Sequence, residues 1–161
     1  MKTHLTLLAI AIPCLALACE GPEFHQLDFW VGIWEARWEG GHGENRVTRT
    51  LDGCVIEEDF RADMSSGDLH GRSLSMYHAR DGLWRQSWVD DQGGFFSLTG
   101  GPRGQDFVLE NIRLDDKSPY LRMVYTDIKP DSLTWHWQKS EDQGAHWRDS
   151  WVIQYKRKRW N

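Results

Sequence analysis

Turn-forming residues recur at short, regular intervals along most of the chain, and this spacing limits the folds available to it. The segments between the turns are about five to nine residues long and rich in Val, Ile, Thr and aromatic residues. Short segments of this kind, separated by hairpin turns, are typical of β-sandwiches and β-barrels. The turn clusters lie at residues 40–43, 52–53, 65–68, 80–82, 90–94, 100–104, 115–119, 129–131 and 141–144.

The segments between these turns predict nine or ten antiparallel strands in meander order. A single domain with this many sequential hairpins most simply closes into a barrel, because closure leaves no exposed edge strand. Only residues 22–31 could form a short helix, which would lead into the first strand or plug the barrel. We therefore expect an all-β fold, a single antiparallel up-and-down β-barrel of about 8–10 strands. The predicted strands are 33–39, 45–51, 55–62, 69–77, 83–89, 95–99, 107–113, 120–127, 132–140 and 147–157.

The first 18 residues have the features of a secretory signal peptide. A basic start at Lys2 precedes an apolar run over residues 5–17, which ends in small residues. Ala16 and Ala18 satisfy the small-x-small cleavage rule, and because Cys19 follows them the stretch also resembles a bacterial lipobox. We expect export across the inner membrane, either as a free periplasmic protein or as an outer-membrane lipoprotein anchored through Cys19. The predicted boundaries are 1–18 signal peptide, 19–28 tether or lead-in, 29–157 barrel and 158–161 basic tail, with the basic cluster 156–159 expected to be solvated.

The cysteines leave two outcomes open for the mature protein. If Cys19 is lipidated, Cys54 is a single thiol, since Cys14 leaves with the signal peptide. If Cys19 is not lipidated, Cys19 and Cys54 could form a disulfide in an oxidising compartment. No cysteine–histidine spacing is typical of a zinc site, so we expect no metal and no cofactor. The net charge of −5 argues against a nucleic-acid partner.

Ten tryptophans are an unusually large number for a chain of this length. Because side chains alternate between the two faces of a strand, four strands each place a pair of indoles on one face. Large aromatic side chains of this kind either fill a barrel core or line a cavity that holds a small ligand, and both can occur in one barrel. The four predicted face groups are Trp34, Ala36 and Trp38; Trp84, Gln86 and Trp88; Leu133, Trp135 and Trp137; and Trp147, Asp149 and Trp151.

Polar residues are mixed into the same strands and suggest anchoring groups for a ligand. Gln86 would face inward if the Trp84 and Trp88 side chains do. Arg122 could pair inside the barrel with Glu57 or Asp59, or it could lie on the outer face, where charged residues are usually found. The predicted ligand-binding residues are Trp38, Tyr77, Trp84, Gln86, Trp88, Arg122, Tyr125, Trp135 and Trp137.

Residues 28–38, DFWVGIWEARW, resemble the opening of lipocalin-like, or calycin, barrels. In those barrels a Gly-x-Trp begins the first strand and the Trp packs across the closed end, which corresponds to Gly32 and Trp34. The segments LDGCVIEEDF, YHARDGLWRQSWVDDQGG and SEDQGAHW are similar to a group of small bacterial envelope proteins of unknown function that are also thought to be calycin-like. The resemblance implies an eight- to ten-stranded barrel with a ligand cup, but it implies no particular ligand.

The heme-binding nitrobindin barrels are a related group with a similar Gly-x-Trp start. They use a histidine on a late strand as the iron ligand, and His136 is the nearest candidate in this chain. Alternation predicts that His136 points away from the face of Trp135 and Trp137. A lone strand histidine of this kind is more often a surface residue than a ligand.

Residues 140–147 fit the Asp-box pattern Ser-x-Asp-x-Gly-x-x-Trp, which resembles the repeat of sialidases. In sialidases the motif recurs several times, in longer chains, and lies away from the active site. We therefore expect a local structural role, in which Asp142 accepts backbone N–H groups, Gly144 takes a positive φ and Trp147 packs beneath the turn.

Three classes of function remain open from the sequence. The first is a binder of a small hydrophobic or amphipathic molecule, and the second is an enzyme that acts on such a molecule with groups such as Glu57 or Glu58 and Tyr125. The third is an envelope interaction module without a small ligand. A cavity above about 300 Å³ would favour the first two, a strongly shifted Glu or Tyr pKa in it would favour the enzyme, and a solid core would favour the third.

Overall fold

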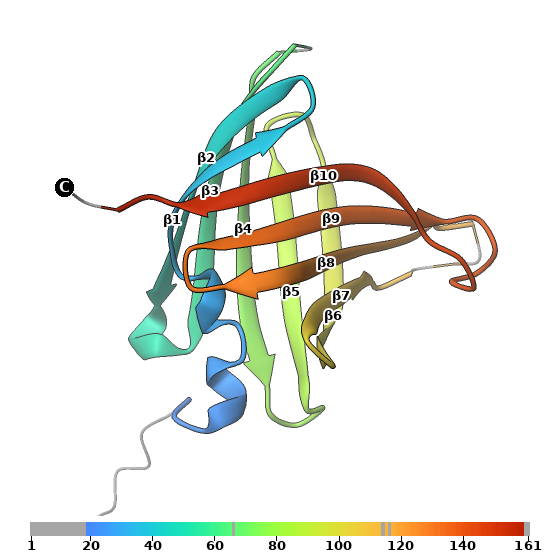
Figure 1. Ribbon diagram of the computed structural model, residues 1–161. Coiled ribbons are helices and arrows are strands. Elements are labelled where there is room, and N and C mark those ends of the chain that lie inside the picture. The colour runs from blue at the N-terminus through green and yellow to red at the C-terminus, as the bar shows by residue number, and fades with distance from the viewer. Residues whose placement is uncertain (1–18, 66, 114, 116, 160–161) are drawn as a thin grey trace, which may run out of the picture.

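The computed structural model describes residues 19–65, 67–113, 115 and 117–159, so the predicted signal peptide lies outside the described residues. In this part of the chain ten antiparallel strands form one closed barrel in meander order, with β1 paired to β10 (Figure 1). The predicted all-β barrel is therefore confirmed. The strands are β1 (Gly32–Trp38), β2 (Gly41–Thr50), β3 (Val55–Met64), β4 (Leu69–His78), β5 (Leu83–Asp90), β6 (Phe95–Arg103), β7 (Asp106–Asn111), β8 (Tyr120–Lys129), β9 (Ser132–Ser140) and β10 (Arg148–Arg157).

Each predicted strand has a counterpart in the barrel, and the main differences are at glycines. Gly41 begins β2 and Gly100 lies inside β6, although both were expected to be in turns. At Gly100 a Cβ atom would lie 2.1 Å from the carbonyl oxygen of Val108 on β7. This glycine therefore allows the backbones of β6 and β7 to approach closely. In the sequence, a glycine with this role cannot be distinguished from a glycine in a turn.

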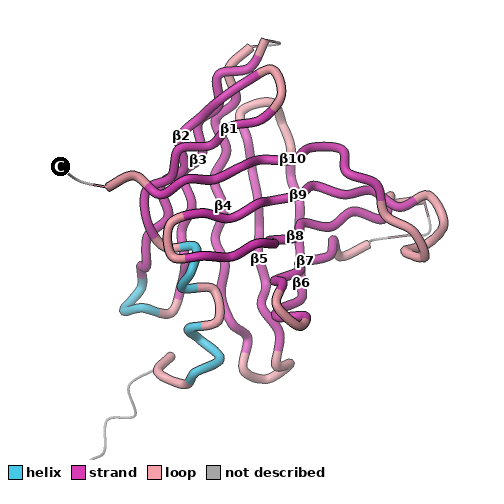
Figure 2. Tube along the Cα trace, viewed as in Figure 1, coloured by secondary structure: helices cyan, strands magenta, loops and turns pink. Residues whose placement is uncertain are grey.

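One end of the barrel is closed by the short helical turns η1 (Pro22–His25) and η2 (Asp28–Trp30), which precede β1 (Figure 2). Trp30 is buried there and stacks on Trp34. The indole Nε1 of Trp34 donates a hydrogen bond to the carbonyl of Trp30 at 2.8 Å. Trp34 thus lies at the closed end, as the Gly-x-Trp pattern predicted.

Arg157, from the C-terminal basic cluster, also belongs to this closed end. Its guanidinium lies 4.0 Å from the centroid of the Trp34 ring and donates to the carbonyl of Phe29 at 2.9 Å. Lys158 pairs with Glu44, and its backbone N–H donates to the carbonyl of Ile33. Arg157 is partly buried by these contacts, whereas the side chain of Lys158 is exposed to solvent, as expected for the cluster.

A disulfide joins Cys19 to Cys54, which lies between η3 (Leu51–Gly53) and β3. A second tie comes from Arg49, whose Nε donates to Asp28 at 2.8 Å. Both ties hold the lead-in against the barrel. The disulfide is one of the two outcomes left open by the sequence, and it excludes a thioether lipid on Cys19 in the same molecule because both bonds use the same Sγ atom.

The first residues of β10 depart from simple alternation. The pairing register with β9 shifts between Asp149 and Trp151, as in a β-bulge. Asp149 accordingly contacts outward-facing polar side chains, whereas Trp151 packs against Trp135 with the ring centroids 5.8 Å apart. The prediction that Trp147, Asp149 and Trp151 share one face is wrong, because a bulge inserts an extra residue and reverses the alternation.

Candidate functional site

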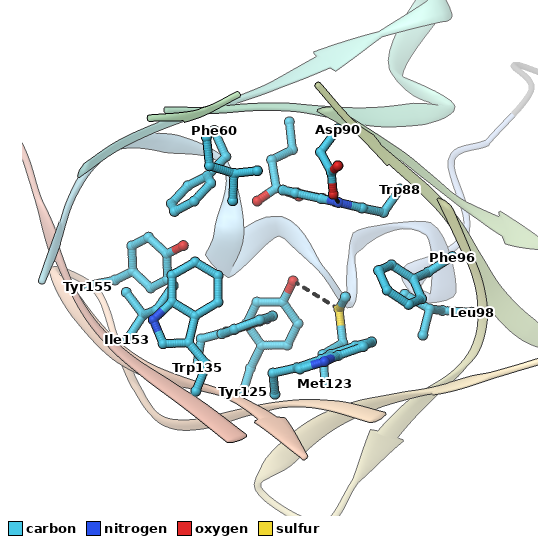
Figure 3. Close-up of a pocket in the computed structure, with 14 residues that line it drawn as sticks. Phe60, Trp88, Asp90, Phe96, Leu98, Met123, Tyr125, Trp135, Ile153 and Tyr155 are labelled. Atoms are coloured by element: carbon cyan, nitrogen blue, oxygen red, sulfur yellow. Dashed lines mark hydrogen bonds between the residues drawn. The ribbon is translucent and has the colours of Figure 1, made fainter. Parts of the chain in front are cut away.

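A cavity of about 130 Å³ lies inside the barrel on the side away from the helical lead-in (Figure 3). Its wall is mainly aromatic and comes from β3, β4, β5, β6, β8, β9 and β10. We call this cavity the cup. The residues that line it are Glu58, Phe60, Leu69, Trp88, Asp90, Phe96, Leu98, Met123, Tyr125, Trp135, Trp137, Trp151, Ile153 and Tyr155.

Six of these residues form a row of aromatic side chains around the cup, which we call the aromatic collar: Phe60, Trp88, Phe96, Trp135, Trp137 and Trp151. From Phe96 through Trp137, Trp135, Trp151 and Phe60 to Trp88, successive ring centroids are 5.1–6.2 Å apart. The two residues at the ends of this row, Trp88 and Phe96, are cross-strand partners on β5 and β6. Five members are only partly buried, with Phe60 the exception. The collar therefore presents aromatic surface to the cup in addition to packing against itself.

The collar also depends on a glycine on the neighbouring strand. A Cβ atom at Gly71 of β4 would lie 2.0 Å from the Trp88 ring. The missing side chain lets the indole lie across β4. In that position the Trp88 Nε1 donates to the carboxylate of Asp90 at 2.9 Å.

Glu58 is the buried carboxyl group of the cup, with 7% of its surface exposed. Its Oε1 accepts a hydrogen bond from the Asn45 amide and its Oε2 accepts one from the Ser73 hydroxyl, each at 2.6 Å. Gln86 extends this network by donating to Ser73 at 3.1 Å and to Ser75 at 2.9 Å. Burial raises the pKa of Glu58 above its ordinary value, although the two hydrogen bonds act in the opposite direction.

Two tyrosines lie beside this network. The Asn45 amide is 3.4 Å from the hydroxyl of Tyr155, and the hydroxyl of Tyr125 donates to the sulfur of Met123 at 3.7 Å (Figure 3). Burial, followed by the nearby Glu58 charge, raises the pKa of both phenols well above the ordinary value. Both hydroxyls therefore stay protonated at neutral pH and can serve as hydrogen-bond donors.

Asp90 is the second carboxyl group of the cup and differs from Glu58 in its surroundings. Besides the Trp88 indole, it accepts backbone N–H bonds from Gly94 at 2.7 Å and Gln92 at 3.1 Å. Burial alone would raise the pKa of Asp90, but these hydrogen bonds outweigh it and lower the pKa below the ordinary value. The cup therefore combines an ionised carboxylate with a buried carboxyl group whose protonated form is favoured.

The structure brings several predicted ligand-binding residues together. Trp88, Tyr125, Trp135 and Trp137 line the cup. Gln86 is buried behind them and reaches Glu58 through Ser73.

Three other predicted ligand-binding residues are not among the residues that line the cup. Trp38 packs against Trp151 with the ring centroids 5.1 Å apart. Trp84 and Tyr77 contact the helical lead-in instead, because Trp84 donates to Gln26 and Tyr77 packs against Phe24. Trp84 and Tyr77 therefore belong to the closed end of the barrel.

Arg122, which was also predicted to bind the ligand, is not among the residues that line the cup. Its Nε donates to Gln138 at 2.6 Å, and its guanidinium lies 4.2 Å from the Trp147 ring centroid on the outer face. Its proposed inner partners also face outward, because Glu57 pairs with Arg72, and Asp59 pairs with His70. On the outer face, Arg122, Glu57 and Asp59 keep contact with water and avoid the cost of burying a charge.

His136, the candidate iron ligand, contacts the outward-facing residues Thr126 and Asp149 at 3.1 Å each. It therefore points away from the cup, as alternation predicted. Among the residues that the structure describes, no group of three or more His, Cys, Asp and Glu side chains could hold a metal ion.

The hairpin at residues 140–147 has the geometry expected of a structural turn. Asp142 accepts the backbone N–H of His146 at 2.7 Å and the hydroxyl of Ser140 at 2.8 Å, and these bonds lower its pKa. Gly144 has a φ of 92°, and the Trp147 indole donates to its carbonyl at 3.0 Å. The turn is remote from the cup, because Trp147 packs on the outer face against Arg122.

Sequence reasoning missed part of the site. Glu58 was considered only as an enzyme candidate, yet its neighbours Ile56 and Phe60 alternate with it and mark it as inward-facing. Trp151 was assigned to the face of Trp147 because the bulge in β10 has no clear sequence signal. Asp90 was attributed only to a turn, although it ends β5 on the same face as Trp88.

No family model and no curated protein matches the chain. The ten-stranded antiparallel barrel is compatible with a lipocalin-like fold. None of the helices in the described residues is long and apolar enough to cross a membrane.

Proposed function

We propose that the barrel binds a small molecule in the cup, with the aromatic collar around its apolar part and Glu58 as a hydrogen-bonding partner. The observation that carries this proposal is the combination of a collar of six aromatic rings with a buried, hydrogen-bonded carboxyl group on one cavity. Apolar pockets with a few well-placed polar groups are typical of ligand sites.

The size of the cup limits the ligand. A volume of about 130 Å³ does not reach the value of about 300 Å³ that would favour a binder or an enzyme of drug-sized molecules, so the size criterion stated from the sequence is not met. The volume is close to that of cavities of about 150 Å³ that accept benzene. We infer that the cup takes a single small ring or a compact branched group, rather than a long acyl chain or a porphyrin.

A filled interior, as expected for a module without a ligand, fits these observations less well. A buried carboxyl group is costly in a core that needs only to be packed, because its ionised form loses its hydration. The closed end of the barrel shows the alternative, since Trp30 and Trp34 stack there at 5.5 Å and are almost fully buried. The difference between the two ends supports a binding role for the collar.

Trp135→Ala tests the proposal, with Trp147→Ala as a matched control on the outer face. We expect the loss of one collar ring to weaken the binding of small aromatic alcohols such as benzyl alcohol about tenfold, which corresponds to about 1.4 kcal/mol. Saturation-transfer NMR titrations would measure the affinities. Equal affinities in both variants and the unmodified protein, or no binding of small neutral or charged molecules at all, would contradict the proposal.

The carboxyl group favours a second candidate function, acid–base catalysis on the bound molecule. Burial raises the pKa of Glu58 above its ordinary value, which is the direction that suits a carboxyl group to act as a general acid. Mass spectrometry of each molecule that binds, incubated with the protein, would reveal turnover. The catalytic candidate requires that Glu58→Gln keeps binding and stops turnover, and it fails if the unmodified protein converts none of the molecules it binds.

We infer further that the chain belongs to the lipocalin-like envelope proteins and acts after export. Support comes from the Gly32–Trp34 start of β1 at the closed end and from the Cys19–Cys54 disulfide, which an oxidising compartment would maintain. Mass spectrometry of the protein from membrane and periplasmic fractions would separate the disulfide form from a form lipidated at Cys19. A protein that is wholly lipidated would contradict the disulfide in its native state.

A further inference from the structure

We infer that the ligand of the cup is a small organic cation, an ammonium group with compact apolar substituents. This inference rests on the proposed function and specifies the class of its ligand. Three independent features of the cup support it: the charge of its lining, the arrangement of its rings and its size.

The charged residues of the lining are acidic. Glu58 and Asp90 contribute carboxyl groups, and among the described residues that line the cup none is basic. The arginines that could have balanced an anion are elsewhere, because Arg122 packs on Trp147 outside and Arg157 packs on Trp34 at the closed end. An anionic ligand such as a fatty acid would therefore be desolvated next to Glu58 without a counter-charge, which is strongly unfavourable.

The collar offers a cation several ring faces. Trp135 and Trp137 are nearly parallel, with 5° between their planes, whereas Trp151 stands at 88° to Trp135. The ring planes around the cup therefore have more than one orientation, as in the aromatic cages that bind quaternary ammonium groups. Four of the six collar residues are Trp, whose ring attracts cations most strongly.

Glu58 supplies a counter-charge that forms when the cation binds. Each of its oxygens accepts one hydrogen bond, so each keeps a second lone pair for another partner. A cation beside Glu58 favours the ionised form of its carboxyl group, because the cation and the carboxylate form a neutral pair. The other titratable groups of the cup are Asp90, Tyr125 and Tyr155, and both phenols stay protonated at neutral pH.

The volume of the cup is appropriate for a compact head group. About 130 Å³ suits a trimethylammonium group or a similarly branched primary ammonium, with any longer substituent directed out of the cup. A cup of this size would discriminate by charge among molecules of the same shape, because the apolar contacts are the same for each of them.

Four molecules that share one branched shape test the inference: choline, 3,3-dimethylbutylammonium, the neutral 3,3-dimethylbutan-1-ol and the anionic 3,3-dimethylbutanoate. We expect at least one cation to bind the unmodified protein ten times more tightly than the alcohol, and the anion to bind more weakly still. Calorimetric titrations at several pH values would measure this. The affinity for the cation should rise with pH, with release of a proton, whereas that for the alcohol should not.

Glu58→Gln and Glu57→Gln provide a matched pair, because the two residues are adjacent on β3 but face opposite sides of the barrel wall. We expect Glu58→Gln to reduce the preference for the cation about tenfold and to remove its pH dependence, and Glu57→Gln to leave both unchanged. If Glu58→Gln does not fold, the comparison of the four molecules on the unmodified protein still decides the question.

The outcomes separate this inference from the proposed function. If the neutral alcohol or the anion binds as tightly as the cations, and Trp135→Ala weakens that binding, the cation inference is overturned and the proposed function stands. If none of the four molecules and no benzyl alcohol binds, both fail. Preference for a cation that is unchanged in Glu58→Gln would overturn the role of this carboxyl group.

Discussion

Glu57 and Glu58 have identical side chains but different surroundings, because they lie on opposite faces of β3. Glu57 pairs with Arg72 on the outer face, whereas Glu58 is buried and held by Asn45 and Ser73. The alternation of β3 predicts that the two point in opposite directions. Which of them faces inward follows from Ile56 and Phe60, which share the face of Glu58.

The buried carboxyl group should make stability depend on pH. Burial raises the pKa of Glu58 above its ordinary value of 4.5, so that above this pH the folded state holds a proton that the unfolded state has lost. Its contribution to the free energy of unfolding is therefore largest below pH 4.5 and falls as pH rises to the folded pKa, by at most about 1.4 kcal/mol per pH unit.

Glu58→Gln should remove this dependence, because glutamine does not titrate. Urea unfolding at pH 5 and pH 8 should show the stability of the variant relative to the unmodified protein increasing with pH. Glu57→Gln should show no such trend. A difference between Glu58→Gln and the unmodified protein that is constant with pH would mean that Glu58 is ionised in the folded barrel at both values.

At the scale of elements, the strands were predictable because their boundaries are set by local turn chemistry. Asp-Gly and similar sequences favour tight turns whatever the tertiary context. The bulge in β10 could not be predicted in this way, because it is selected by packing. It turns Trp151 into the cup while Trp147 stays on the outer face. Because the bulge shifts the pairing register by one residue, Trp151 was not among the predicted ligand-binding residues.

The helical lead-in is a second element whose place depends on distant contacts. Only its short helical character and a possible role as a plug could be predicted from residues 22–31. Its position depends on the Cys19–Cys54 disulfide, on the ion pair of Arg49 with Asp28 and on the burial of Trp30. These partners are far apart in sequence and have no local signature.

Removal of the disulfide should therefore destabilise the barrel. We expect Cys54→Ser to lower the free energy of unfolding by about 2–4 kcal/mol under oxidising conditions, because the cross-link restricts the unfolded chain. Guanidinium unfolding with and without a reductant would measure the loss. The reductant should lower the stability of the unmodified protein to that of the variant. Stability that does not change in either comparison would show that the lead-in needs no cross-link.

At the scale of the whole molecule, the barrel has two unlike ends. The closed end is packed with Trp30, Trp34 and Arg157, and the other side of the interior contains the cup with its collar. The number of tryptophans indicated both uses of indole, but the sequence could not divide them between core and cavity. The division depends on how the ten strands close into a barrel and on where the lead-in packs. Neither can be read from a single segment of the sequence.

The measurement that tests this account most directly is the NMR spectrum of the indole N–H groups during titration with choline and with 3,3-dimethylbutan-1-ol. The account predicts that the resonances of Trp88, Trp135, Trp137 and Trp151 shift with one or both molecules. Those of Trp30, Trp34 and Trp147 should stay in place, because these rings lie at the closed end or on the outer face. Saturable shifts confined to Trp147, or no saturable shift of any collar indole, would contradict the claim that the cup is the binding site.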